Sequence, residues 1–272
     1  MALKQNQENN NYPARDNAIE WEKRSINYGA SWKSVLFKGM PDLANEHFHN
    51  CHINFILECL KSNKDDIRIL DIGCGYGRLS LPIIQKLPQA QIIGLDISAN
   101  YVNLYKENTG RDAFVGTLES LPSEIGTFDY IIVVTVLMYL PKNNLKEVFS
   151  NLFSHLNKNG KIIIIEPAQS GIILQTGFGL AKLLHKDNSI NTGGTCFSSA
   201  EIPNLVHDAG GIVIQEQRIP ATTFFFLLIY LIAKTLPPNL TYIVFRSISV
   251  MDRLLKRTKL PTLWAFYLIE RK

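Results

Sequence analysis

Cysteine and charge are both scarce in this chain of 272 residues. Its 4 cysteines include no Cys-x-x-Cys pair, and we expect neither a zinc site, nor a disulfide framework, nor a secretory leader. Such cysteine usage is typical of a reducing compartment, so a cytoplasmic protein is predicted. Charged residues make up 19% and hydrophobic residues 46% of the chain, which are values of a globular protein with a sizeable core.

Long hydrophobic runs and repeats are missing as well. A fully apolar stretch at 224–233 ends at Lys234 and is too short for a bilayer span, which takes about 20 residues. The length of the chain fits one domain with additions. Residues 1–16 begin with a segment rich in Asn and Gln that has no periodic apolar positions, and they are predicted to be a disordered tail.

The most informative stretch is a glycine-rich segment that follows an apolar run at 67–72. Gly73, Gly75 and Gly77 alternate there, and apolar residues then resume at helical spacing, which predicts a strand, a tight turn and a helix. Glycine allows positive φ and lets a ligand approach the main chain. The third glycine comes one position too early for a dinucleotide site, and the carboxylate of Asp71 would repel a pyrophosphate but suits an ammonium group.

A second strand, at 91–96, ends in Asp96 about 20 residues past the glycines, where a carboxylate accepts the hydroxyls of a ribose. With Asp71 and the glycines, this region resembles the first motif of the class I S-adenosylmethionine-dependent methyltransferases, in particular those that act on small molecules and lipids. The donor has an ammonium group and no phosphate. The resemblance covers 67–209 and the last strand, and it implies a Rossmann-like α/β fold with a seven-stranded, mostly parallel sheet and an antiparallel last strand.

The resemblance also implies the residues that bind S-adenosylmethionine. They are Asp71, Gly73, Cys74, Gly75, Gly77, Asp96, Ile97, Thr117, Leu118 and Thr135. Thr117 stands where many relatives have an aspartate facing the adenine, so the adenine contact would rest on backbone groups near Thr117 and on packing by Ile97 and Leu118. Cys74 is expected to be a small side chain inside the turn.

Catalysis by such a protein comes mainly from holding the acceptor and the methyl donor in line, and no dedicated base is required. A phenolic or enolic acceptor would need one. Tyr139, His185 and Glu166 are the candidate catalytic residues, chosen only because they lie near the ends of strands that form the pocket.

The region before the first strand, 17–62, is predicted to be a helical cap. In the methyltransferases that the chain resembles, such helices close over the cofactor or the acceptor, which makes Tyr28 and Trp32 candidate lid residues. The cap also carries His47, His49 and His52. Only the last two share a helix face, and no carboxylate or cysteine completes a ligand set, so no metal site is expected.

Two insertions interrupt the core predicted at 63–220 and its last strand at 261–272. Insertions at 167–197 and 221–260 both follow strands that end at the ligand-binding edge of the sheet, so both are expected over the acceptor pocket. From residue 221 onward the chain has a net charge of +6, and an apolar helix beside basic residues is typical of membrane-surface contact. A lid over an apolar acceptor and a homodimer interface are equally compatible with this pattern.

The sequence therefore predicts transfer of a methyl group from S-adenosylmethionine to a small, hydrophobic or lipid-like acceptor. Two alternatives stay open: a regulatory or assembly subunit that binds S-adenosylmethionine with little activity, and a protein or RNA methyltransferase. Against a nucleic-acid partner stand the lack of a Lys/Arg-rich strip with interleaved aromatics and the lack of an Asn-Pro-Pro-Tyr motif after the fourth strand.

Overall fold

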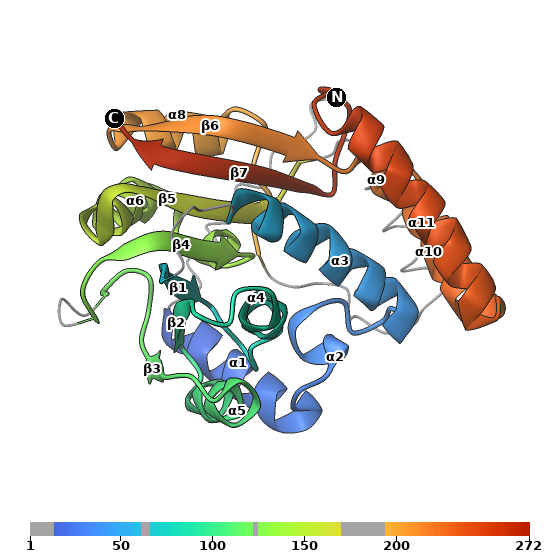
Figure 1. Ribbon diagram of the computed structural model, residues 1–272, viewed down its shortest axis with the longest axis horizontal. Helices are drawn as coiled ribbons and strands as arrows, with labels where there is room; N and C mark the ends of the chain where they lie inside the picture. The colour runs from blue at the N-terminus through green and yellow to red at the C-terminus, as the bar shows by residue number, and fades with distance from the viewer. Residues whose placement is uncertain (1–13, 61–65, 122–124, 170–193) are drawn as a thin grey trace, which may run out of the picture.

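In the computed structural model, which describes residues 14–60, 66–121, 125–169 and 194–272, one seven-stranded sheet forms the centre of the molecule (Figure 1). The strand order is β3-β2-β1-β4-β5-β7-β6, and β7 is antiparallel to both of its neighbours while the remaining pairs are parallel. The predicted fold is thereby confirmed. The strands are β1 (Arg68–Ile72), β2 (Gln91–Asp96), β3 (Ala113–Val115), β4 (Phe128–Val134), β5 (Leu156–Pro167), β6 (Gly211–Arg218) and β7 (Trp264–Arg271).

Helices cover both faces of the sheet. The helices that precede β4 in the chain are α1 (Ala14–Tyr28), α2 (Trp32–Val35), α3 (Asp42–Cys59), α4 (Ser80–Lys86) and α5 (Ala99–Thr109). The helices that follow β4 are the short 3-10 helices η2 (Leu137–Tyr139) and η3 (Lys142–Asn144), then α6 (Leu145–Ser154), α8 (Glu201–Asp208), α9 (Pro220–Phe224), α10 (Phe226–Thr235) and α11 (Pro238–Leu255). None of the described helices is long and apolar enough to cross a membrane.

Two hydrophobic cores follow from the alternation of side chains along the central strands. Ile69, Ile132 and Ile163 face one core, which α3, α4 and the three helices α9 to α11 close. The intervening residues, such as Leu70 and Ile131, face the other core under α6 and α8. Central parallel strands that are buried on both faces read as continuous apolar runs, which is why β4 and β5 could be located from the sequence.

The helices α9 to α11 are fastened to α3 by a buried polar cluster. The carboxylate of Asp252 on α11 accepts the backbone N–H groups of Ala221 (2.7 Å) and Thr222 (3.2 Å) at the start of α9. The hydroxyl of Thr222 also donates to Asp252 (2.5 Å), so it must accept from Nε2–H of His47 (2.9 Å). Burial lowers the pKa of His47 to about 4, which keeps its ring neutral. These contacts join α9 and α11 to α3 of the cap.

Candidate active site

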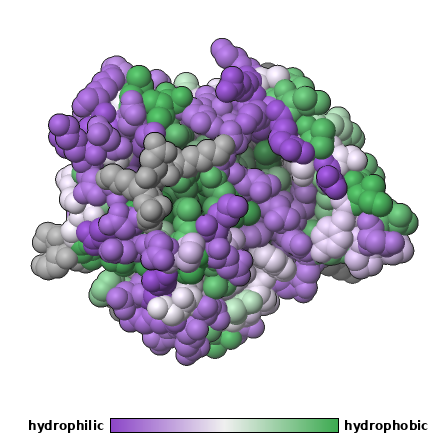
Figure 2. All heavy atoms as spheres, viewed as in Figure 1, coloured by the Kyte–Doolittle hydropathy of each residue, from purple (hydrophilic) through white to green (hydrophobic). Residues whose placement is uncertain are grey.

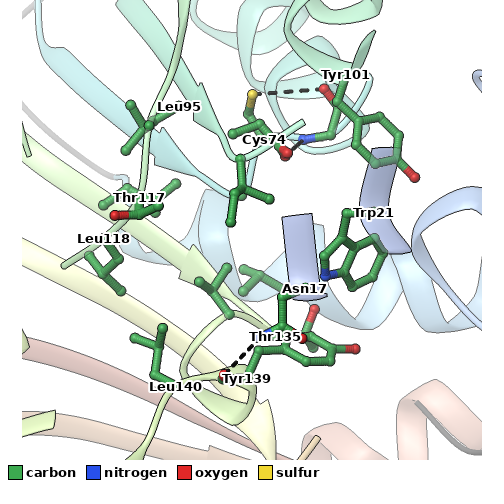
Figure 3. Close-up of a pocket in the computed structure, with 18 of the residues that line it drawn as sticks. Asn17, Trp21, Cys74, Leu95, Tyr101, Thr117, Leu118, Thr135, Tyr139 and Leu140 are labelled. Carbon is green, nitrogen blue, oxygen red and sulfur yellow. Dashed lines mark hydrogen bonds between the residues drawn. The ribbon is translucent and has the colours of Figure 1, made fainter. Parts of the chain in front are cut away.

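A cavity of about 490 Å³ lies where the strand order reverses, at the carboxyl ends of β1, β2 and β4 (Figure 3). This is the crevice in which open α/β sheets bind ligands, and its volume is in the range of small-molecule sites. Its wall combines the glycine turn after β1, the ends of β2 and β4, the segment after β3, and two turns of α1. Strands far apart in sequence therefore form one site.

The glycine turn has the backbone that the sequence predicted. Gly73, Gly75 and Gly77 have φ of +70°, +53° and +89°, a region that side chains with a Cβ rarely adopt. A Cβ on Gly73 would lie 2.5 Å from Val136 Cγ2, so this position is closed to larger residues by contact as well as by conformation. Gly73 and Gly75 line the cavity. Gly77 does not line it, since its α-carbon faces Thr109 of α5 instead.

Asp96 at the end of β2 lies on the cavity wall, as predicted. One carboxylate oxygen accepts the N–H of Gly75 (2.8 Å) and the other accepts the N–H of Ser98 (3.0 Å). Burial raises the pKa of Asp96 to about 6 against these stabilising hydrogen bonds. A carboxylate on the cavity wall fits a ligand with neighbouring hydroxyl groups, such as the ribose of S-adenosylmethionine.

Asp71, in contrast, is not on the described cavity wall. Its side chain is 2% exposed and accepts the hydroxyl of Ser80 (2.7 Å), which in turn accepts from the hydroxyl of Tyr105 (3.0 Å). Burial raises the pKa of Asp71 to about 6. The direct contact of Asp71 with the donor's ammonium group therefore stays a prediction, since the described lining of the cavity does not include this residue. Side chains alternate along β1, and that alternation turns Asp71 away from the cavity that Ile72 lines.

Arg78 is a wall residue that the sequence analysis did not select. It is 8% exposed, and its guanidinium donates to Nδ1 of His49 (3.1 Å) and Nδ1 of His52 (3.4 Å) on α3. Both rings must be neutral to accept these bonds, and burial together with Arg78 lowers the pKa of each histidine. The position of Arg78 directly after the glycine turn is the sequence signal that could have identified it as a residue of the site. The histidines thus position a cation and do not complete a metal site among the described residues.

Other predicted donor-site residues are on the wall. Cys74, Ile97, Thr117, Leu118 and Thr135 all line the cavity. Thr135 has a φ of +55°, which is unusual for a β-branched residue and is held by a backbone bond from its N–H to Ile165 O (2.8 Å). Strained backbone of this kind is concentrated at functional sites.

The candidate catalytic residues are separated by the structure. Tyr139 lines the cavity, but Glu166 is fully buried and accepts the N–H groups of Val136 (2.8 Å), Leu137 (2.7 Å) and Met138 (3.3 Å). Burial raises the pKa of Glu166 to about 8. The prediction of a catalytic Glu166 is not supported, because its oxygens are occupied by the loop that carries Tyr139. His185 lies outside the described residues.

The N-terminal cap does reach the cavity, though through other residues than expected. Asn17 and Trp21 of α1 line it, whereas Tyr28 and Trp32 do not. Asn17 donates to Tyr139 O (3.2 Å), and the ring of Trp21 meets the ring of Tyr139 edge-on at 5.3 Å. Tyr28 lies at the last turn of α1, which has already passed the cavity, and Trp32 packs against His49.

The second insertion is not over the described cavity. No residue of 221–260 is among those that line it. β6 lies at the far edge of the sheet, separated from β4 by β5 and β7, so it delivers α9 to α11 to α3 and not to the cavity. Only the two ends of the first insertion, 167–197, belong to the described residues. At its second end, Thr195 donates its N–H to Met138 O (2.9 Å) in the loop that follows β4.

Comparison with known proteins points to the same part of the chain. Residues 69–160 match the model of a family described as a methyltransferase domain. The chain is 29% identical to a ubiquinone biosynthesis O-methyltransferase of Rickettsia prowazekii over 43% of its own length and 47% of that protein. It is 32% identical to a malonyl-[acyl-carrier protein] O-methyltransferase of Bacillus anthracis, over 57% of this chain and 59% of that protein. It is 24% identical to a tRNA N(3)-methylcytidine methyltransferase of Drosophila melanogaster, over 56% of this chain and 50% of that protein. The chain thus covers about half the length of these relatives.

Solved structures share the fold. An S-adenosylmethionine-dependent methyltransferase from Leishmania major superposes with a TM-score of 0.57 at 16% identity, over 93% of this chain and 82% of that one. Magnesium protoporphyrin IX methyltransferase from Synechocystis, with S-adenosylmethionine bound, superposes with a TM-score of 0.53 at 16% identity, over 74% and 88%.

These likenesses and the geometry agree. Residues 69–160 match a methyltransferase domain and include the glycine turn and Asp96, in agreement with the predicted resemblance to the class I S-adenosylmethionine-dependent methyltransferases. The comparisons support the predicted family, the predicted class of enzyme and S-adenosylmethionine as the cofactor.

Proposed function

We propose that this chain transfers the methyl group of S-adenosylmethionine to a small, apolar acceptor bound in the cavity beside Trp21. The observation that carries the proposal is a cavity whose wall combines a polar group with aromatic and aliphatic side chains, several of which Figure 3 shows. Gly73, Gly75 and Asp96 line the cavity, and so do Trp21, Tyr139 and Leu140. A polar donor site that adjoins an aromatic and aliphatic pocket is what methylation of an apolar molecule requires.

Four groups of the wall would hold the cofactor. Asp96 would accept the ribose hydroxyls, and Thr117 and Leu118 would border the adenine. Arg78 would pair with the carboxylate of the methionine moiety, because it is a buried cation on the wall whose direct partners are two neutral rings. Burial lowers the pKa of Arg78 to about 10, and an anion in the cavity would offset that unfavourable burial.

The bound cofactor supplies an electrophilic methyl group, and the chain supplies position and exclusion of water. Glu166 fixes the loop after β4 through three backbone N–H groups, and that loop places Tyr139 against Trp21. Asn17 ties α1 to the same loop. The cap and the loop therefore close the acceptor side together.

The charges on the wall favour a small neutral acceptor. Among the described wall residues, the charged ones are Arg78, Asp96 and Glu119, and the first two are engaged at the donor side. The names of the relatives refer to ubiquinone biosynthesis, to malonyl-[acyl-carrier protein] and to tRNA. A tRNA acceptor would call for several cations around the cavity to neutralise phosphates, and the described wall offers only Arg78.

The test incubates the protein and S-adenosylmethionine with apolar and polar extract fractions and follows gain of one methyl group by mass spectrometry. We expect a methylated product in the apolar fraction. Trp21→Ala should lower its formation about tenfold or more while S-adenosylhomocysteine affinity stays, since a buried aromatic contributes about 1.5–3 kcal/mol. Tyr28→Ala, on the same helix but off the cavity, is the control. Tight cofactor binding without any product would instead indicate a regulatory subunit.

A second test addresses Arg78 alone. Arg78→Met should weaken S-adenosylhomocysteine binding about tenfold or more, because it removes a charged hydrogen-bonding partner, and should leave 5′-methylthioadenosine binding unchanged, because that ligand lacks the carboxylate. Calorimetric titration of both ligands measures this. Equal losses for the two ligands would contradict the assignment of Arg78 to the carboxylate.

A further inference from the structure

Helix α11 has two apolar faces, and only one of them is buried. Thr241, Phe245, Ile248 and Asp252 recur at helical spacing and are buried toward the rest of the protein. A second stripe, also at intervals of three and four residues, is directed outward and consists of Leu240, Ile243, Ser247, Val250 and Leu254. Its apolar members are 46%, 62%, 41% and 79% exposed, respectively. A helix that only packs on a protein core needs one such stripe.

The neighbouring helices extend this apolar surface. Phe224, Leu228 and Leu231, again three and four residues apart, are 48%, 44% and 44% exposed. Figure 2 shows apolar side chains interspersed with hydrophilic ones along the edge of the molecule where Figure 1 places α10 and α11. Exposed apolar surface gathered on adjacent elements marks an interaction site more often than scattered single residues do.

Positive charge accompanies the outward stripe. Arg246 and Arg253 are exposed on α11 and flank the stripe on one side, and Arg257 follows directly after the helix. Lys234 and Lys259 are exposed as well, whereas Lys256 is paired with Glu58 (2.9 Å). The only acidic residue of 221–260 is Asp252, which is 6% exposed and accepts backbone N–H groups of α9. The exposed charges of this segment therefore all have the same sign.

We propose that the outward stripe of α11 binds the surface of an anionic phospholipid bilayer, with the helix lying in the plane of the interface. Ile243 and Leu254 enter the acyl boundary, and Arg246 and Arg253 contact lipid phosphates. Apolar residues beside basic ones on a preformed helix are the features of interfacial membrane helices, and anionic headgroups attract each nearby Lys or Arg.

Charge complementarity selects this partner over a second copy of the chain. A two-fold dimer through the stripe would place the same arginine row of both copies at one interface, without an exposed acid in 221–260 to neutralise it. Anionic lipid supplies the missing negative charge. The polar cluster of His47, Thr222 and Asp252 holds α9 to α11 in place, so docking requires little ordering of the chain. The proposal does not depend on the methyl acceptor.

The experiment measures flotation of the full chain with phosphatidylcholine vesicles, with and without an equal part of phosphatidylglycerol. We expect binding to the mixed vesicles that weakens as salt is raised, and little binding to phosphatidylcholine alone. Ile243→Ser combined with Leu254→Ser should lower vesicle affinity at least about tenfold. Arg246→Gln combined with Arg253→Gln should remove most of the preference for phosphatidylglycerol.

The matched control is Ile212→Ser combined with Ile214→Ser on edge strand β6, where the side chains are 44% and 41% exposed. Circular dichroism and the melting temperature check that each variant is folded. Control and α11 variants that lose binding equally, or an α11 variant that binds as the parent does, would overturn the proposal. So would a dimer in the absence of vesicles that the change at Ile243 and Leu254 splits, since the stripe would then be a protein interface.

Discussion

Two buried aspartates, Asp96 at the end of β2 and Asp252 on α11, have closely similar local chemistry and different surroundings. Each accepts backbone N–H groups, and burial raises the pKa of each. The remaining acceptor capacity of Asp252 is used by the hydroxyl of Thr222, which links it to His47. Asp96 borders the cavity, where a ligand would use that capacity. The same side chain therefore stabilises a helix junction in one region and is available for recognition in the other.

The contrast shows that a buried acid indicates a site only when a cavity adjoins it. Asp71 makes the same point within the donor region, since it is as buried as Asp96 and is turned toward Ser80. Substitutions at these positions should therefore divide into those that alter unfolding and those that alter binding.

The largest effect is expected for Asp252→Ala. Removing this carboxylate leaves the N–H groups of Ala221 and Thr222 without their acceptor in a buried place, which should lower the free energy of unfolding by about 3 kcal/mol. Urea denaturation measures it, with the exposed Asp208→Ala as control. Cofactor affinity of the folded variant should not change. A normal unfolding midpoint would mean that the junction of α9 and α11 does not depend on Asp252.

Asp96→Ala should act on binding. It removes a charged acceptor at the cavity, a class of hydrogen bond worth about 1.5–3 kcal/mol, so S-adenosylhomocysteine affinity should fall roughly tenfold or more. Asp71→Ala should lower the free energy of unfolding and weaken binding less than Asp96→Ala. Calorimetric titration separates the two. Equal losses of affinity would show that Asp71 contacts the cofactor after all.

A pair of glycines tests the turn itself. Gly73→Ala and Gly110→Ala both place a Cβ on a residue with positive φ (+70° and +65°), at a cost of about 1–2 kcal/mol of stability each. At Gly73 the added Cβ would also lie 2.5 Å from Val136 Cγ2, which is too close, whereas at Gly110 it would have no atom within 4 Å. We expect lower cofactor affinity for the first variant alone, by thermal-shift titration with S-adenosylhomocysteine. Equal cofactor affinities of the two variants would argue against a cofactor site at Gly73.

The smallest effect concerns pH. Burial raises the pKa of Asp96 from 3.8 to about 6, so the free protein takes up a proton there as pH falls below 6. The ionised carboxylate is the better acceptor for hydroxyl groups, so cofactor affinity should decrease between pH 7 and pH 5, by at most about tenfold for one proton. Asp96→Asn should have lower affinity at neutral pH and a flatter profile. A profile unchanged in this variant would assign the titration to another group.

The donor region could be predicted in detail because its signals are local. Consecutive residues at 69–77 and 91–96 form strand, turn and strand end, so glycine spacing and a terminal acid were enough to place Gly73, Gly75 and Asp96 on one wall. The cap was harder. One helix carries Trp21 and Tyr28, and its sequence does not say which turn passes the cavity.

The sequence alone determined the sheet and the glycine turn, since each depends on periodicity or spacing within a short segment, and the resemblance to methyltransferases rests on these same segments. Tertiary structure decided the roles of the individual polar residues, because burial and orientation depend on elements distant in the chain. It assigned Glu166 to the backbone of the loop after β4, placed Arg78 between α3 and the cavity, and moved the helices at 221–260 to the far edge of the sheet. Strand order is the physical reason for the last of these, since two strands, β5 and β7, separate β6 from β4.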